Sequence, residues 1–167
     1  MQILAQTAYL SLGSNLADRA AHVEQAIRRL EAIGKVTARS SLYETEPMEM
    51  KNQPWFLNCA IAFETRMSPQ QLLEATLSIE QSMGRMRLAP KGPRIIDIDL
   101  LLFSDYVENS TTLTVPHPAL HRRRFVLEPL AEIAPDVRHP VLKKTVREML
   151  ESLPLSDDGA VRKLTEI

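Results

Sequence analysis

Two aspartates, Asp97 and Asp99, stand two positions apart in the otherwise apolar run Ile95–Phe103. Successive side chains of a β-strand point to opposite faces, so we expect both carboxylates on one face, about 7 Å apart along the chain, with Ile98 and Leu100 on the other. Two ionised carboxylates on an apolar strand repel each other and lose hydration unless a cation lies between them. Mg²⁺ is usually held by one or two carboxylates together with phosphate oxygens, so the pair predicts a magnesium site.

A second interpretation of this strand is that its outer face is solvated and each aspartate pairs with an arginine. An Asp-x-Asp motif is short and by itself not specific. Aspartate is a poor strand former, however, and two aspartates in so apolar a run favour a bound cation over a solvated face.

Two groups of basic residues flank the strand. No acidic residue occurs from Gln81 to Ile96, and a second basic group runs from His121 to Arg124. Guanidinium groups bind phosphate oxygens through forked hydrogen bonds, whereas the whole chain has a net charge of only −1. The pattern favours a compact anionic ligand over nucleic acid, with a solvated basic loop as the alternative. The cations of the first group are Arg85, Arg87, Lys91 and Arg94.

Three further residues suit a flat ligand. Phe56 and Phe125 could stack on the faces of a planar heterocycle, and the Asn58 amide could read its edge. The alternative for both phenylalanines is ordinary core packing. His117 lies between two prolines that stiffen its backbone, so its imidazole is either presented to a ligand or structural. With the acids and cations, these residues predict a Mg²⁺-dependent transfer of phosphate groups from ATP to a small planar substrate.

Strands and helices alternate along the chain. Apolar periodicity and turn residues predict the order strand, helix, strand, strand, helix, strand, which gives an α/β (α+β) fold, a ferredoxin-like βαββαβ sandwich with extra C-terminal helices. Gly13–Asn15 is expected to break the first strand, and Gly34 to end the first helix in a left-handed conformation. Ser68, Pro69 and Gln71 predict a capping box for the second helix, as Thr145 and Glu148 do for a helix in the tail. The expected strands are 8–12, 36–44, 57–64 and 95–103, and the expected helices are 18–33, 69–83, 125–133 and 145–153.

The composition indicates one catalytic domain over residues 1–167, within the size of an ordinary domain. The one cysteine, Cys59, cannot form an internal disulfide and is expected in the core. The sequence has no pattern typical of a signal peptide and no apolar stretch of about 20 residues. We therefore expect a cytoplasmic protein, a monomer, without a membrane or nucleic-acid partner.

Several of these segments together resemble the 6-hydroxymethyl-7,8-dihydropterin pyrophosphokinases of folate biosynthesis. The resemblance runs from about Ala8 to Pro140, and the Gly-Pro-Arg-x-x-Asp-x-Asp block with a downstream Val-Pro-His-Pro is highly specific. The matching segments are AYLSLGSNL at 8–16, SLYET at 41–45, QPWFLN at 53–58, Gly84-Arg85, GPRIIDID at 92–99, TVPHP at 114–118 and RRF at 123–125.

The resemblance implies that the hydroxymethyl oxygen of the pterin attacks the β-phosphorus of ATP, so that pyrophosphate passes to the pterin and AMP leaves. It implies two Mg²⁺ ions on Asp97 and Asp99, with Arg85 and Arg94 bracing the migrating phosphates. It also implies that the pterin lies between Phe56 and Phe125 and is read by Asn58, Thr45 and the Met48 backbone. The remaining implied contacts are from Arg87, Lys91 and Arg123 to the phosphates, and from Glu80, Thr114 and His117 to the nucleotide.

From the residues alone, two other functions stay open. One is a Mg²⁺-dependent kinase that transfers only the γ-phosphate and releases ADP. The other is a ferredoxin-like binding module that uses its basic loops on RNA, although the chain lacks the positive net charge and the aromatic strand pairs typical of such modules.

Overall fold

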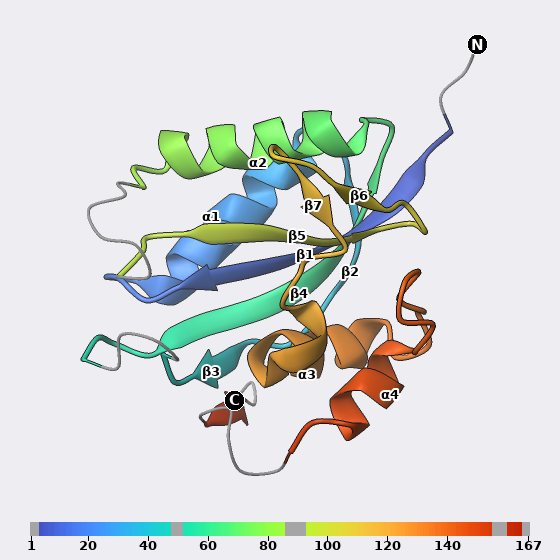
Figure 1. Cartoon of the computed structure of the whole chain (residues 1–167). Helices are drawn as coiled ribbons and strands as arrows, with labels where there is room; N and C mark the ends of the chain where they lie inside the picture. The colour runs from blue at the N-terminus through green and yellow to red at the C-terminus, as the bar shows by residue number, and fades with distance from the viewer. Residues whose placement is uncertain (1–3, 48–51, 86–92, 155–159, 165–167) are drawn as a thin grey trace.

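The structure is a computed structural model that describes residues 4–47, 52–85, 93–154 and 160–164. An antiparallel sheet lies between two helical layers, with α1 and α2 on one face and α3 and α4 on the other (Figure 1). Each layer buries its own apolar cluster against the sheet. The strand that carries the two aspartates is at one edge of this sheet.

The sheet has the order β5-β1-β4-β3-β8, and β2 pairs with β4 as well. All of these pairs are antiparallel. The order, with α1 after β1 and α2 after β4, is that of a ferredoxin-like sandwich and confirms the predicted α/β fold. The strands are β1 (Gln6–Ser14), β2 (Lys35–Arg39), β3 (Tyr43–Thr45), β4 (Phe56–Thr65), β5 (Asp97–Phe103) and β8 (Val161–Lys163).

The predicted strand 36–44 is wrong as one element, because β2 and β3 are separate. Ser40 lies between them, and its backbone N–H donates to Ala60 O at 2.8 Å. Its hydroxyl accepts from Ala60 N at 2.9 Å. At the end of β2, the Ser40 hydroxyl therefore replaces a backbone acceptor of the β-sheet. The next strand, β3, then pairs with the first residues of β4, whereas β2 pairs with its last residues.

A register shift in β5 changes the simple alternation of its side chains. Leu10 pairs with Leu100 and Tyr9 with Leu102, which leaves Leu101 as an extra residue. Leu101 and Leu102 consequently both pack on the α3 side, whereas Ile98 and Leu100 pack against α1 and α2. The bulge lies beyond the aspartates and leaves their alternation intact.

The first helix, α1 (Arg19–Glu31), begins at Asp18, whose carboxylate accepts from Ala21 N. Its C-cap, Ala32, is right-handed, and Gly34 has no positive φ, so the expected left-handed cap at Gly34 is wrong. Glycine is needed there for space, because a Cβ would lie 2.3 Å from Phe63 Cζ.

The second helix, α2 (Pro69–Ser82), has the predicted capping box of Ser68 and Gln71, and Gly84 follows it with a φ of 90°. The tail contains the short hairpin β6 (Glu108–Asn109) and β7 (Thr114–Val115), a 3-10 turn (Leu120–Arg122), α3 (Arg124–Ile133) and α4 (Val146–Glu151). The capping box of Thr145 and Glu148 is confirmed, as is the burial of Cys59. Among the described residues, no helix has the length and apolar character needed to cross a bilayer.

Candidate active site

Asp97 and Asp99 lie on β5 beside the last residues of β1. Gly13 is the register partner of Asp97, and Ser11 that of Asp99. Both aspartates border one cavity of about 620 Å³, while Ile98 between them is buried in the α1–α2 core. The predicted placement of both acids on one face is confirmed.

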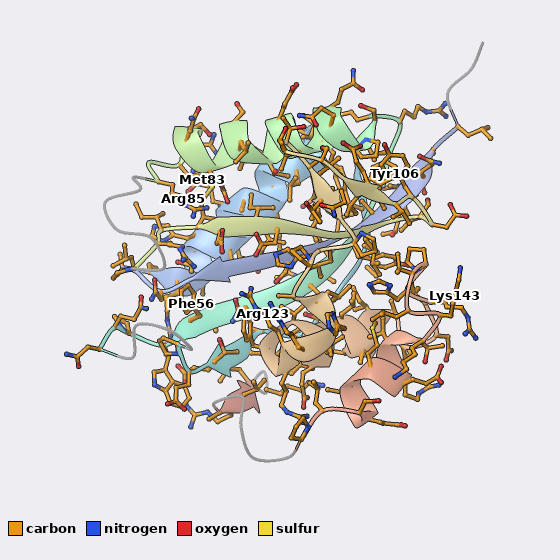
Figure 2. All side chains as sticks on the ribbon, viewed as in Figure 1. Phe56, Met83, Arg85, Tyr106, Arg123 and Lys143 are labelled. Atoms are coloured by element: carbon orange, nitrogen blue, oxygen red, sulfur yellow. The ribbon has the colours of Figure 1, made fainter. Side chains whose placement is uncertain are left out.

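The cavity brings together most of the residues that the sequence singled out. Figure 2 shows Phe56 and Arg85 toward the end of the sheet opposite Tyr106, with Arg123 between them and Tyr106, at the start of α3. Met48, Arg87 and Lys91 lie outside the described residues. The predicted residues that line the cavity are Thr45, Phe56, Asn58, Arg85, Arg94, Asp97, Asp99, His117, Arg123 and Phe125.

A smaller cavity of about 210 Å³ opens between α2, β5 and β7. Glu80 and Thr114 line it, and it shares Asp99 and His117 with the larger one. The two cavities therefore meet at the acids. A ligand with a polar chain between two bulky ends fits this arrangement, because its centre would lie against Asp97 and Asp99.

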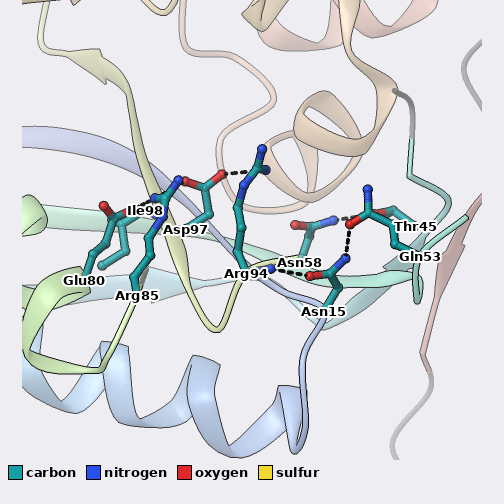
Figure 3. A network of polar contacts seen from close by, with 9 residues as sticks. All are labelled: Asn15, Thr45, Gln53, Asn58, Glu80, Arg85, Arg94, Asp97 and Ile98. Carbon is teal, nitrogen blue, oxygen red and sulfur yellow. Dashed lines mark hydrogen bonds and ion pairs between the residues drawn. The ribbon is translucent and has the colours of Figure 1, made fainter. Parts of the chain in front are cut away.

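Asp97 is bracketed by arginines. Arg85 Nη1 donates to Asp97 Oδ1 at 2.9 Å, and Arg94 Nη1 lies 3.5 Å from Asp97 Oδ2 (Figure 3). Arg85 Nη1 also donates to Glu80 Oε2 at 2.7 Å. Glu80 is only 3% exposed, and burial raises its pKa against the opposing effects of the Ile98 N–H and Arg85. The alternative interpretation of this strand was a solvated face with each aspartate paired to an arginine. Asp97 has such a pairing, but Asp99 does not.

Asp99 has no such partner. Within the described parts of the chain, its carboxylate makes no hydrogen bond or ion pair. Burial, followed by the charges of Asp97 and Glu80, raises its pKa to about 7. The charges of Arg123 and Arg85 oppose this rise, but no described residue makes a direct polar contact with the carboxylate, and a bound cation would supply such a contact.

These donors fit Mg²⁺. In the described ranges, no group of three or more His, Cys, Asp or Glu side chains could hold a metal ion. A site with two carboxylates and no further protein ligand suits Mg²⁺, which keeps water and phosphate oxygens in its shell. The same donor set is poor for zinc, which takes nitrogen and sulfur ligands.

The opposite wall of the cavity carries the aromatic and amide groups. Asn58 Nδ2 donates to Thr45 Oγ1 at 2.5 Å, which joins β4 to β3. The guanidinium of Arg94 lies 5.8 Å from the Phe56 ring centre, and that of Arg123 lies 5.5 Å from the Phe125 ring centre. Each phenyl ring is therefore paired with a cation at the cavity, where a flat ligand could meet both.

His117 lies at the junction of the two cavities. Its Nδ1 accepts a hydrogen bond from Ala119 N at 3.1 Å, which leaves Nε2 for a ligand. Burial and the charge of Arg123 lower the pKa of His117, so its neutral form is favoured. Both interpretations of this histidine hold in part, because one ring nitrogen is structural and the ring borders the cavity.

Sequence reasoning assigned no role to Gly13 or Asn15. The break expected at Gly13–Asn15 comes only at Asn15, since β1 continues through Ser14. Gly13 is needed because a Cβ would lie 2.3 Å from Asn58 Oδ1. Asn15 is 1% exposed, and its Nδ2 donates to Pro54 O at 3.0 Å. Its Oδ1 accepts from Arg94 N at 2.7 Å (Figure 3). An asparagine two residues after a glycine, just past the end of a strand, was the available signal.

Comparison with known proteins gives consistent matches. A family model described as 7,8-dihydro-6-hydroxymethylpterin-pyrophosphokinase (HPPK) matches residues 9–135. A 2-amino-4-hydroxy-6-hydroxymethyldihydropteridine pyrophosphokinase of Methylorubrum extorquens is 46% identical over 148 residues, covering 87% of this chain and 92% of the relative. The protein of that name from Aquifex aeolicus is 41% identical over 142 residues, covering 85% of this chain and 89% of the relative.

Longer proteins match as well. The folic acid synthesis protein fol1 of Schizosaccharomyces pombe is 48% identical over 149 residues, which cover 88% of this chain but 20% of the relative. The crystal structure of Plasmodium falciparum HPPK-DHPS with pteroate has a TM-score of 0.72 and 18% identity, covering 90% of this chain and 43% of that one. This chain spans about a fifth of fol1 and less than half of the Plasmodium protein. The structural match, at so low an identity, shows a shared fold.

Proposed function

This chain belongs to the 7,8-dihydro-6-hydroxymethylpterin-pyrophosphokinase family, and on that basis we propose that it catalyses the reaction of the family. It transfers pyrophosphate from ATP to the hydroxymethyl group of 6-hydroxymethyl-7,8-dihydropterin and releases AMP, a step of tetrahydrofolate biosynthesis. The observation that carries the proposal is the single cavity that holds Asp97, Asp99, two arginines and the phenyl rings of Phe56 and Phe125.

We propose that Asp97 and Asp99 would hold Mg²⁺, with two ions assigned to them on the family resemblance. When bound, Mg²⁺ supplies positive charge that neutralises the triphosphate in the transfer. Support comes from Asp99, whose carboxylate has no partner within the described residues and whose pKa is raised to about 7. Asp97 takes part once Arg85 and Arg94 have turned from its carboxylate to phosphate oxygens.

The basic side chains neutralise the negative charge of the phosphates that are transferred. Arg85 and Arg94 border the acids and bind the migrating phosphates, where forked donors match the phosphate oxygens. Arg123, at the same cavity, is assigned to a further phosphate. Arg87 and Lys91 are assigned to the phosphates on the family resemblance alone.

The pterin occupies the larger cavity, and the nucleoside of ATP occupies the smaller one. The pterin lies between Phe56 and Phe125, with its edge at Asn58, Thr45 and the Met48 backbone. The nucleoside lies in the smaller cavity, where Glu80, Thr114 and His117 are assigned to it. The pterin oxygen and the β-phosphorus then meet beside Asp97 and Asp99. The new bond joins that oxygen to the β-phosphorus, and the bond to the bridging oxygen of the α-phosphate breaks, so that AMP carries the electron pair away.

The nucleotide product tests this function. Purified protein with ATP, Mg²⁺ and 6-hydroxymethyl-7,8-dihydropterin should give AMP and pterin pyrophosphate in equal amounts, measured by anion-exchange chromatography. EDTA should stop the reaction, since the acids alone leave the triphosphate unneutralised. Formation of ADP would instead indicate a γ-phosphate kinase. Salt-sensitive RNA binding with no turnover would indicate a binding module.

A further inference from the structure

The last strand of the sheet, β8, lies outside residues 9–135, the segment that matches the family model. It forms the edge of the sheet next to β3, where Figure 1 draws it as a short red arrow. Thr45 pairs with Val161 on this side and with Phe56 of β4 on the other. The strand that carries Thr45 to the pterin side of the cavity is therefore held from both edges.

Backbone contacts extend the support on both sides of this pairing. Leu164 N donates to Leu42 O at 2.8 Å, and Glu46 N donates to Ala160 O at 2.9 Å. Ala160 N in turn donates to the Glu46 carboxylate at 3.1 Å. Glu46 lines the large cavity together with Thr45, so β8 contacts the cavity wall itself.

The Glu44 carboxylate contacts two arginines from different parts of the chain. Its Oε2 accepts from Arg19 Nη2 at 3.0 Å, and its Oε1 contacts Arg162 of β8. Arg19 Nη1 also donates to Trp55 O at 2.9 Å. These bonds from Arg19 and Arg162 lower the pKa of Glu44 and keep it ionised.

Arg162 also contacts Trp55, the residue before Phe56. Its guanidinium lies 5.9 Å from the centre of the Trp55 ring, within reach of a cation–π contact. Trp55 immediately precedes Phe56, whose ring lines the cavity. One side chain of β8 thus touches both Glu44, the neighbour of Thr45, and Trp55, the neighbour of Phe56.

We propose that Arg162 is a positioning residue for the pterin, which acts through Glu44 and Trp55 to fix Thr45 and Phe56 before the ligand arrives. The proposal rests on the proposed function, because it assigns that wall to the pterin. The Arg162 side chain is 66% exposed, and exposed ion pairs contribute little to folding stability. Its main effect is therefore to hold the pterin-binding wall in one conformation before the ligand binds. Such preorganisation strengthens ligand binding because less conformational entropy is lost.

Steady-state kinetics of Arg162→Ala test the proposal, with AMP as the measured product. We expect KM for the pterin to rise roughly 3- to 10-fold, as for the loss of one partly exposed contact that orders a wall. KM for ATP and kcat should change less than about twofold, since Asp97, Asp99 and the arginines beside them are untouched. Arg162→Lys keeps the charge and should recover part of the pterin affinity.

Lys163→Ala is the matched control. Lys163 is the next residue of β8, and its ammonium lies 3.5 Å from Glu132. This variant also removes one cation from β8, but it should leave KM for the pterin unchanged. An equal rise of KM in both variants, or an equal rise for ATP and pterin in Arg162→Ala, would show a merely structural role.

Trp55 gives a readout that does not depend on turnover. It is the only tryptophan of the chain, so acrylamide quenching of tryptophan fluorescence, excited at wavelengths that tyrosine does not absorb, reports on this residue alone. Quenching should increase in Arg162→Ala and not in Lys163→Ala. A wild-type protein that makes no AMP would refute the proposed function, and unchanged quenching and pterin KM in an active Arg162→Ala enzyme would refute only the positioning role.

Discussion

Arg85 contacts two acids of different character. Its Nη1 lies 2.7 Å from Glu80 Oε2 and 2.9 Å from Asp97 Oδ1. Glu80 is buried and also accepts the Ile98 N–H at 2.7 Å, so it is fixed to the backbone of β5. Asp97 is the more exposed of the two. We infer that Glu80 keeps the guanidinium in the cavity while its contact with Asp97 can be exchanged for a phosphate oxygen.

Asp99 gives a prediction on stability and pH. Its folded pKa of about 7 lies above the ordinary aspartate value of 3.8, so the folded state holds its proton more tightly than the unfolded state. The stability associated with that proton is present below the unfolded pKa and is lost as pH rises through the folded pKa. Asparagine does not ionise. Asp99→Asn should therefore be more stable than wild type at pH 8 without metal, by up to about 4 kcal/mol, the free energy that corresponds to a pKa of about 7 instead of 3.8.

Urea unfolding of both proteins in EDTA, at pH 4 and pH 8, checks this value. The advantage of Asp99→Asn should be small at pH 4 and should grow toward pH 8, whereas AMP formation should be almost absent. Asp105→Asn, which changes an exposed aspartate in a turn after β5, should show no such pH-dependent gain. An Asp99→Asn protein less stable than wild type at pH 8 would mean that the carboxylate has compensation from the protein.

At the scale of elements, Asn15 connects the two segments to which we have assigned the two substrates. Its amide donates to Pro54 O and accepts from Arg94 N, and its backbone N–H donates to Arg94 O at 3.1 Å. The end of β1 therefore joins the segment before Phe56 to the entrance of β5. Asn15 thus links the proposed pterin wall to Arg94, which we propose binds phosphate.

Asn15→Ala should weaken the binding of both substrates. It leaves Pro54 O and Arg94 N without these partners, a loss of about 1–3 kcal/mol of stability. KM should rise for ATP as well as for the pterin, which distinguishes this variant from Arg162→Ala. Thermal unfolding together with the two KM values measures both effects. A rise confined to the pterin would indicate that Arg94 keeps its place without the asparagine.

The elements differ in how far their sequences predict them. Helix α2 was predictable because Ser68, Pro69 and Gln71 form a local signal that needs no tertiary contact. The Asp97–Asp99 face was predictable because alternation along a strand is local as well. The separation of β2 from β3, the space needed at Gly13 and the pairing of β8 were not. Each depends on a partner far along the chain, namely Ala60, Asn58 and Thr45.

At the scale of the whole molecule, two helical layers and a sheet surround a site where acidic side chains are concentrated. Apolar clusters fill both faces of the sheet, and the acids Glu80, Asp97 and Asp99 meet at the cavities. Because part of the folding free energy opposes this concentration of charge, ligands that bring positive charge should stabilise the fold by more than their contacts alone.

Thermal unfolding should therefore depend on Mg²⁺ and nucleotide together. A non-hydrolysable ATP analogue with Mg²⁺, at about 100 times its Kd, should add about 2.7 kcal/mol and raise Tm by about 5–10 °C in a chain of this size. The analogue with EDTA should give less than half of that shift, because the acids and the phosphates then repel each other. Mg²⁺ alone should also give less than half of it, because the phosphate oxygens that complete its shell are missing. Asp99→Asn should start from a higher Tm at pH 8 and lose most of the Mg²⁺-dependent part, since the ion no longer relieves a buried charge. The same shift with and without Mg²⁺ would mean that the arginines alone hold the phosphates and that the acids of β5 serve another purpose.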